Sequence, residues 1–143
     1  METSPITATT KKIVRLESLK ADLQKEREGD WIKAVDINPG LRWFVRSTNY
    51  PAFRIARDAE MKKLGEKYGG DQIPDDVNAE VMGKLAVEHL LLGWDGMDVE
   101  YTPETAGEIL TDESYRKVRY SIYLAASRVG TSEVQFVEGT AKN

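Results

Sequence analysis

The side chains that could perform acid–base chemistry are few and match no known catalytic motif. His89 is the only histidine, and it could act as a general base. It shares one face of an expected helix with Met82 and Leu85, which favours a structural histidine. No Gly-x-Ser-x-Gly or comparable nucleophile context accompanies it. We therefore expect no enzymatic activity, and a small acid–base enzyme using His89 is the least favoured alternative.

An acidic stretch follows this helix and could bind a divalent cation through Asp95, Asp98 and Glu100. Their spacing differs from that of a calcium-binding loop, and three acids in a loop are usually solvated. Gly69 and Gly70 do not match a phosphate-binding loop either. We expect no metal and no cofactor.

Arginines and aromatic residues alternate further upstream: the arginines are Arg42, Arg46, Arg54 and Arg57, and the aromatic residues among them include Trp43, Tyr50 and Phe53. This pattern is compatible with a nucleic-acid surface, where bases stack on aromatic rings. An ordinary charged face with aromatic core residues gives the same pattern and is the favoured interpretation. The formal net charge of -4 makes nucleic acid an unexpected partner. A small regulatory nucleic-acid-binding protein using this arginine face is the alternative function.

Length and composition predict one small globular domain. The chain has 143 residues, of which 41% are hydrophobic and 31% charged, and it contains no cysteine. We expect a disordered N-terminus over residues 1–12, a single globular domain over 13–130 and a flexible tail over 131–143. Neither a signal peptide nor a membrane span is expected, so the predicted location is the cytoplasm.

The elements that would position these residues are a β-hairpin and several helices. Two apolar runs flank the turn Asn38-Pro39-Gly40, which predicts a hairpin over residues 30–46. The fold class is therefore mainly α with an N-terminal β-hairpin, a small α+β domain. Helices are expected at about 51–67, 76–92, 103–110 and 112–129. The region from about 15 to 28 favours an amphipathic helix, with a strand at 11–16 as the alternative.

The expected core and the expected contact surface follow from the same pattern. Leu90, Leu91 and Leu92 make the end of the third helix apolar all round, which indicates a central core helix with Trp94 packed on its last turn. A two-stranded hairpin is unstable alone and must pack on the helices or on a partner. We expect protein contacts through the hairpin and the helix after it: Trp31, Arg42, Trp43, Phe44, Arg46, Tyr50 and Phe53.

The order of short motifs resembles the tail assembly chaperones of long-tailed bacteriophages, over about residues 15–128. The matching pieces are Gly29-Asp30-Trp31, Pro39-Gly40, Trp43-Phe44-Val45-Arg46, Asn49-Tyr50-Pro51-Ala52-Phe53, Leu91-Leu92-Gly93-Trp94-Asp95-Gly96, Tyr101-Thr102-Pro103-Glu104-Thr105 and Ile109-Leu110. Their order and spacing carry the resemblance, more than any one piece.

The resemblance implies a non-enzymatic protein that binds the long, helical tape measure protein, keeps it soluble and assists assembly of the tail tube. It also implies contact with the tail tube protein, formation of a homo-oligomer, residence in the host cell cytoplasm and absence from the mature virion. A chaperone of this kind must cover long apolar stripes reversibly.

Overall fold

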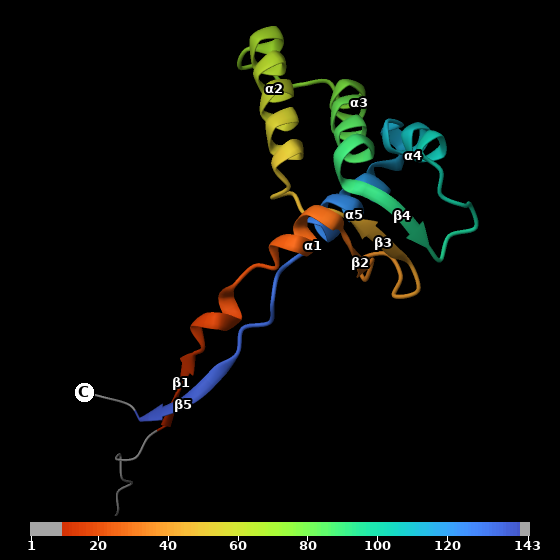
Figure 1. Cartoon of the computed structure of the whole chain (residues 1–143). Coiled ribbons are helices and arrows are strands. Elements are labelled where there is room, and N and C mark those ends of the chain that lie inside the picture. The colour runs from red at the N-terminus through yellow and green to blue at the C-terminus, as the bar shows by residue number, and fades with distance from the viewer. Residues whose placement is uncertain (1–9, 141–143) are drawn as a thin grey trace, which may run out of the picture. The chain divides into compact units, whose positions relative to one another are not determined.

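The structure, a computed structural model, describes residues 10–140 and divides them between two compact units (Figure 1). One unit runs from Leu23 to Gly130. The other combines the described residues up to Asp22 with those from Thr131 onward. The disorder expected for residues 1–9 and the end of the expected tail, residues 141–143, lie outside the described part of the chain.

The unit from Leu23 to Gly130 is built on a three-stranded antiparallel sheet in the order β2-β3-β4. The strands are β2 (Asp30–Lys33), β3 (Arg42–Val45) and β4 (Leu91–Asp95). The turn between β2 and β3 is fastened by Asn38, whose side-chain oxygen accepts a hydrogen bond from the backbone N–H of Gly40 at 2.8 Å. The hairpin therefore lies where its turn residues indicated, with an added third strand.

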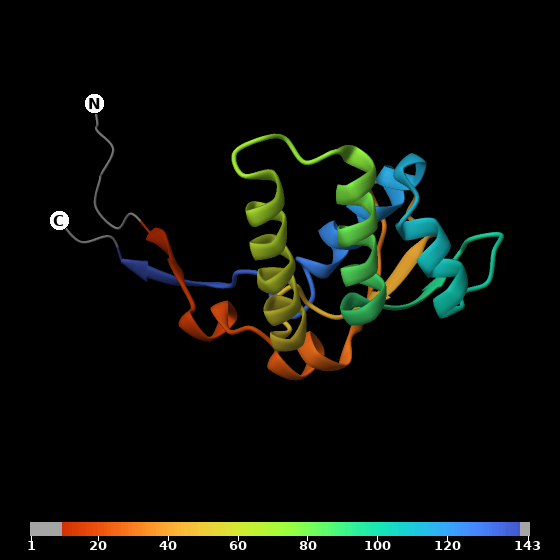
Figure 2. The same ribbon diagram turned by 90° about the horizontal axis from the view of Figure 1, so that it is seen from above.

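Helices supply the rest of this unit: α1 (Leu23–Glu28), α2 (Pro51–Tyr68), α3 (Asp75–Leu85), α4 (Pro103–Leu110) and α5 (Arg116–Ala126). A π-helical turn, η2 (Ala86–Leu90), continues α3, and a 3₁₀ turn, η3 (Glu113–Tyr115), precedes α5. Thr102 caps α4, because its hydroxyl accepts from the N–H of Thr105 at 3.0 Å. Figure 2 shows α2 and α3 side by side, joined by one loop.

The core lies between the sheet and α5, and an aromatic row runs through it. Trp43 and Trp94 are directly opposite each other on β3 and β4, and their rings meet edge to face at 6.2 Å. Tyr101 continues the row with a second edge contact, 5.1 Å from Trp94. The buried residues of α5 include Ile122, Ala125 and Ala126. The α+β class expected from the sequence is thereby confirmed.

Close packing of α3 on α4 depends on one glycine. Gly83 is buried on α3, and a Cβ atom placed there would overlap the carbonyl group of Leu110 at the end of α4. Any larger side chain would push the two helices apart, so this position admits only glycine without rearrangement.

Three expected elements differ from the structure. The helix expected to reach residue 92 ends at Leu90, and Leu91 is already extended, with φ -81° and ψ 126°. The helix expected from residue 112 becomes α-helical only at Arg116. The helix expected over 15–28 is a 3₁₀ turn, η1 (Leu16–Leu19), followed by the short α1. Local apolar periodicity missed these breaks because tertiary strand pairing and capping set them.

The second unit is a two-stranded antiparallel ribbon of β1 (Thr10–Val14) and β5 (Phe136–Thr140). The expected disorder at residues 10–12 and the expected flexible tail at 131–140 are therefore wrong where these residues are paired. The pairing joins positions about 125 residues apart, such as Ile13 with Val137, so no local pattern announces it. The predicted domain start at residue 13 also differs, since residues 13–22 belong to this unit.

Candidate protein-binding surface

The sheet turns one face away from the core, and the strand alternation determines which side chains lie there. On β3, Trp43 and Val45 are buried, whereas Arg42 and Phe44 are only half-buried. Cross-strand pairing then adds their partners to the same face. We call this the outer sheet face; its members are Trp31, Lys33, Arg42, Phe44, Gly93 and Asp95.

Trp31 is the most exposed large hydrophobic side chain of the outer sheet face, with 41% of its surface accessible. Its ring lies 5.1 Å from that of Phe44 in a tilted contact, and the Arg42 guanidinium sits 4.6 Å from the Trp31 ring centroid. Arg42 and Phe44 thus hold the indole in place. The result is a fixed, water-exposed aromatic surface with a cation at its side.

A salt bridge crosses the same face from β3 to β4. The Arg42 guanidinium donates to the carboxylate of Asp95 at 2.8 Å. The loop that follows is folded over Trp94, whose indole N–H donates to the carbonyl of Val99 at 2.6 Å. Gly96 has a φ of +95° and approaches the backbone of Gly40 so closely that a Cβ would clash. The acidic loop is therefore ordered by these backbone contacts.

Two expected contact residues belong to the core, so their assignment to the binding surface is corrected. Trp43 has 0% exposure, and its indole N–H donates to the hydroxyl of Ser121 at 2.9 Å; that hydroxyl donates to Asp36 at 3.2 Å. Phe53 is also buried, 6.0 Å from the ring of Tyr123. Alternation places Trp43 on the opposite face from Arg42 and Phe44, and Phe53 anchors α2.

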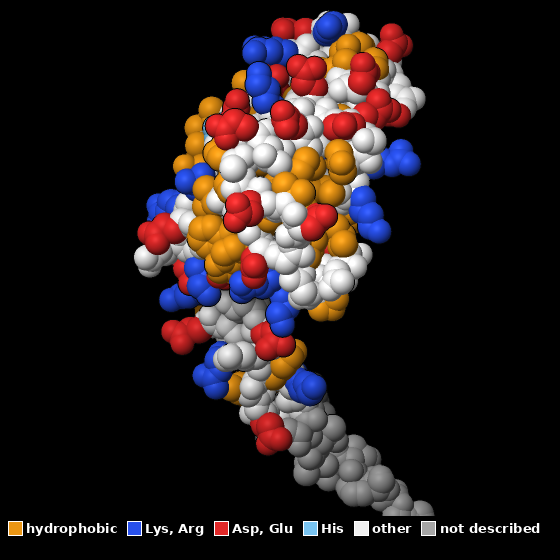
Figure 3. Space-filling view, turned by 90° about the vertical axis from the view of Figure 1, so that its right-hand side faces the viewer, with side chains coloured by type: hydrophobic (Ala, Val, Ile, Leu, Met, Phe, Trp, Pro, Cys, Tyr) orange, Lys and Arg blue, Asp and Glu red, His pale blue; other side chains and the backbone are white. Residues whose placement is uncertain are grey.

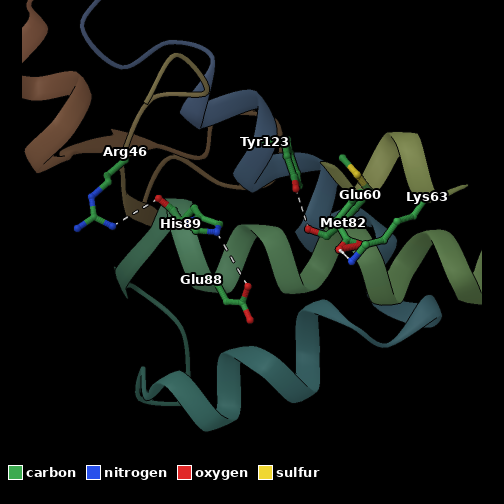
Figure 4. A network of polar contacts seen from close by, with 7 residues as sticks. All are labelled: Arg46, Glu60, Lys63, Met82, Glu88, His89 and Tyr123. Atoms are coloured by element: carbon green, nitrogen blue, oxygen red, sulfur yellow. Dashed lines mark hydrogen bonds and ion pairs between the residues drawn. The ribbon is translucent and has the colours of Figure 1, made fainter. Parts of the chain in front are cut away.

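Arg46 donates hydrogen bonds to the ends of two helices. Its place among aromatic residues in the sequence did not indicate this role. Its Nε donates to the carbonyl of Arg27 in α1 at 2.8 Å, and one terminal nitrogen donates to the carbonyl of His89 at 3.4 Å (Figure 4). Such carbonyls lack partners within their own helix. The guanidinium also lies 4.8 Å from the ring centroid of Tyr50. Arg46 and Tyr50 are thus structural neighbours, while Trp31, Arg42 and Phe44 form the candidate surface.

The arginine face of the alternative function is distributed over different elements. Arg42 lies on β3, Arg46 follows it, and Arg54 and Arg57 lie on α2. Arg57 pairs with Asp58 at 3.3 Å and stacks 5.6 Å from Phe53. Three of the four guanidinium groups therefore already have protein partners, so they are poorly disposed to hold phosphates.

A neighbouring part of the unit is strongly acidic. The residues from 95 to 113 contain no Lys or Arg and these acids: Asp95, Asp98, Glu100, Glu104, Glu108, Asp112 and Glu113. Figure 3, which faces the side of α4, shows acidic side chains spread over this face, with Lys and Arg mainly at its margins. The negative electrostatic potential of these acids repels the phosphate backbone of nucleic acids and favours partners that carry positive charge.

His89 lies in the π-helical turn η2 with its side chain about one quarter exposed, and its Nε2 is 4.0 Å from the Glu88 carboxylate (Figure 4). Within residues 10–140, no group of three or more His, Asp or Glu side chains is arranged to hold a metal ion. Among the helices of that same range, none combines the length and apolar character that a membrane span needs.

Tyr123 joins α5 to α3 from within the helical layer. Its hydroxyl donates to the carbonyl of Met82 at 2.7 Å (Figure 4). Burial raises the pKa of Tyr123 well above the usual tyrosine value, although the nearby Arg119 and Arg57 act in the opposite direction. Tyr101, at the edge of the aromatic row, also has a raised pKa, first because of burial and then because of Glu104.

Sequence reasoning missed β4 and, with it, Asp95 as the ion-pair partner of Arg42. The run from Leu90 to Leu92 suggested a helix end, yet Leu91 and Trp94 both face the core while Leu92 and Gly93 are half-buried. Gly93 within an apolar run was a signal for a strand with a bulge, and the β3–β4 ladder does shift its register beside Gly93.

Comparison with known proteins gives one family match. The family described as YdaY prophage protein matches residues 48–143, which is more than half of the chain. The matched range includes α2 to α5, β4 and β5, and it begins after β3. Neither the curated proteins nor the solved structures give a match.

Proposed function

Since the chain belongs to the YdaY prophage protein family and is therefore phage-related, we propose that it is a phage tail assembly chaperone. In this proposal the protein has no enzymatic activity. It binds the tape measure protein in the host cell cytoplasm, keeps it soluble and delivers it to the tail tube protein, and it is absent from the mature virion. The support comes from the order of motifs in the sequence and from the exposed aromatic surface.

The observation that carries the proposal is the held, exposed indole of Trp31. A large aromatic side chain fixed by Arg42 and Phe44 offers apolar contact area at little further cost in side-chain entropy. Apolar stripes of a long helical partner can cover Trp31 and Phe44, while Arg42 and Asp95 form a polar rim. A contact centred on a few side chains suits reversible binding, which a chaperone that leaves the particle requires.

The test is co-expression with the tape measure protein of the same phage, followed by size-exclusion chromatography with light scattering. The expected result is a soluble complex containing a partner that is insoluble alone. Trp31→Ser should abolish co-elution or weaken it by about tenfold or more. Val35→Ser is the matched control, because Val35 is exposed on the hairpin but lies outside the outer sheet face. Equal loss with Val35→Ser, or full binding with Trp31→Ser, would remove the outer sheet face from the proposal.

Two further readouts address the rest of the proposal. Mass spectrometry of purified particles should find no peptide of this chain. A salt titration of any complex separates the alternative, since a nucleic-acid binder loses affinity steeply as salt rises, whereas an apolar contact does not. Failure to solubilise the tape measure protein, together with steep salt-dependent binding to nucleic acid, would replace the chaperone by the regulatory alternative.

A further inference from the structure

A groove between α2 and α3 lies outside the outer sheet face and has no role in the function proposed above. Its volume is about 290 Å³. The floor is apolar and the rim is mostly acidic: the lining residues are Ala56, Ala59, Val81 and Leu85 on the floor, and Glu60, Glu80, Lys84 and Glu88 on the rim. Glu60 is paired with Lys63 at 3.3 Å, and Glu80 and Glu88 against Lys84 leave the rim with a net negative charge.

The groove exists because α2 contributes few large side chains to the core. Of its 18 residues only Phe53 and Leu64 are buried. Ala56 and Ala59 leave space opposite Val81 and Leu85, and Ile55 beside them is exposed. An apolar floor of this kind is stabilised when side chains from another segment remove it from water.

The other unit of the chain exposes a segment with complementary character. Leu16 and Leu19 are the first and last residues of the 3₁₀ turn η1, with 81% and 56% of their surfaces exposed. Residues i and i+3 of a 3₁₀ turn lie on the same side, so the two leucines form one apolar projection. Arg15 and Lys20 flank the turn and Glu17 lies within it, so the segment carries a net positive charge.

Hydrogen bonds fix the conformation of η1, in which the two leucines are exposed. The hydroxyl of Ser18 donates to the carbonyl of Arg15 at 2.7 Å and accepts from the backbone N–H of Gln135 at 2.9 Å. The N–H of Arg15 donates to the carbonyl of Gln135 at 2.8 Å. The turn is thereby tied to the chain segment before β5, so little conformational freedom is lost when its leucines are buried.

We propose that Leu16 and Leu19 of one copy dock in the α2–α3 groove of a second copy, and that the second copy reciprocates. The two leucines cover the apolar floor, while Arg15 and Lys20 lie against the acidic rim. A volume of about 290 Å³ equals roughly ten water molecules at ~30 Å³ each, which accommodates two leucine side chains. Reciprocal exchange gives a closed two-fold dimer that uses each contact twice.

The measurement is sedimentation velocity of the full-length chain alone, from low to high micromolar concentration. The expected result is a reversible rise from the 16.1 kDa monomer to a dimer. Because no tape measure protein is present, this outcome is independent of the chaperone proposal. A monomer at every concentration would overturn the inference.

Two variants test whether the dimer contact is formed by the turn η1 on one side and by the α2–α3 groove on the other. Leu19→Glu puts a negative charge in place of an apolar side chain, and Glu80→Lys reverses one charge of the rim. Each should raise the dimer dissociation constant by about tenfold or more. Val35→Glu, at an exposed apolar site on the hairpin, should leave it unchanged. Circular dichroism checks that every variant is folded.

Mixing the two variants gives the decisive result. A mixed pair keeps one intact contact, because the Leu19→Glu chain retains its groove and the Glu80→Lys chain retains its turn. The mixture should therefore dimerise more strongly than either variant alone. Three results would show that another surface joins the copies. The mixture could dimerise as weakly as each variant alone, only one of the two variants could weaken the dimer, or Val35→Glu could weaken it as much as they do.

Discussion

Trp43 should contribute to the stability of the fold and not to partner binding. Replacing it with phenylalanine removes the indole N–H that donates to Ser121 at 2.9 Å, which costs about 1 kcal/mol. The smaller ring also removes two buried carbons, which adds about 1.6 kcal/mol at ~0.8 kcal/mol each. We expect Trp43→Phe to lower the free energy of unfolding by about 2.5 kcal/mol and to leave partner affinity unchanged.

A double-mutant cycle separates the hydrogen bond from the packing. Ser121→Ala leaves the buried indole N–H without an acceptor and should cost about 1–3 kcal/mol in the parent chain. In the Trp43→Phe background the same change should cost about 1 kcal/mol less, because the donor is already gone. Asp36, the other partner of the Ser121 hydroxyl, is exposed, so water can replace that bond.

The assay is urea unfolding followed by far-ultraviolet circular dichroism, with the slope of each transition checked for constancy. If the stability losses of Trp43→Phe and Ser121→Ala simply add in the double variant, the hydrogen bond between these side chains does not stabilise the fold. A Trp43→Phe chain within about 0.5 kcal/mol of the parent would contradict the packing estimate. Weaker partner binding at unchanged stability would return Trp43 to the contact surface.

Three further outcomes are expected, each from a single observation. Gly83→Ala should lower the free energy of unfolding by about 2 kcal/mol in thermal melts, because its methyl group would overlap the carbonyl of Leu110. Asp95→Asn should cost less than about 1 kcal/mol, with the loss shrinking as salt rises, because the Arg42 and Asp95 side chains of this salt bridge are 40% and 60% exposed. Burial raises the pKa of Tyr123, so on raising the pH the unfolded state ionises first, and the stability present below about pH 10 is lost above it. Tyr123→Phe should flatten that alkaline decline in urea midpoints, and an unchanged decline would assign it to other groups.

Much of the local structure follows from local sequence signals. Asn38, Pro39 and Gly40 indicated a turn between two strands, and the side chain of Asn38 makes the turn hydrogen bond. Thr102 and Pro103 indicated the start of α4, and the Thr102 hydroxyl caps it. These signals act over a few residues, so a single sequence suffices to read them.

Distant pairing was not predictable in the same way. β4 lies beside β3 because Trp94 meets Trp43, and β1 pairs with β5 across almost the whole chain. Of the candidate surface, Trp31, Arg42 and Phe44 were expected, and alternation along β3 would also have excluded Trp43. The role of Arg46 could not be predicted, because the helix ends that it fastens are set by tertiary structure.

The offset in the ladder between β3 and β4 has a consequence for length variation. Phe44 pairs with Gly93, and Val45 pairs with Leu91, so Leu92 is one residue more than a regular ladder needs. The π-helical turn just before it likewise holds one residue more than an α-helical turn. A relative that lacks a residue equivalent to Leu92 would keep Leu91 and Trp94 facing the core, whereas loss of Gly93 would bring Leu92 opposite Phe44. Among relatives of this chain, we therefore expect single-residue deletions in β4 to occur at the position of Leu92 and not at that of Gly93.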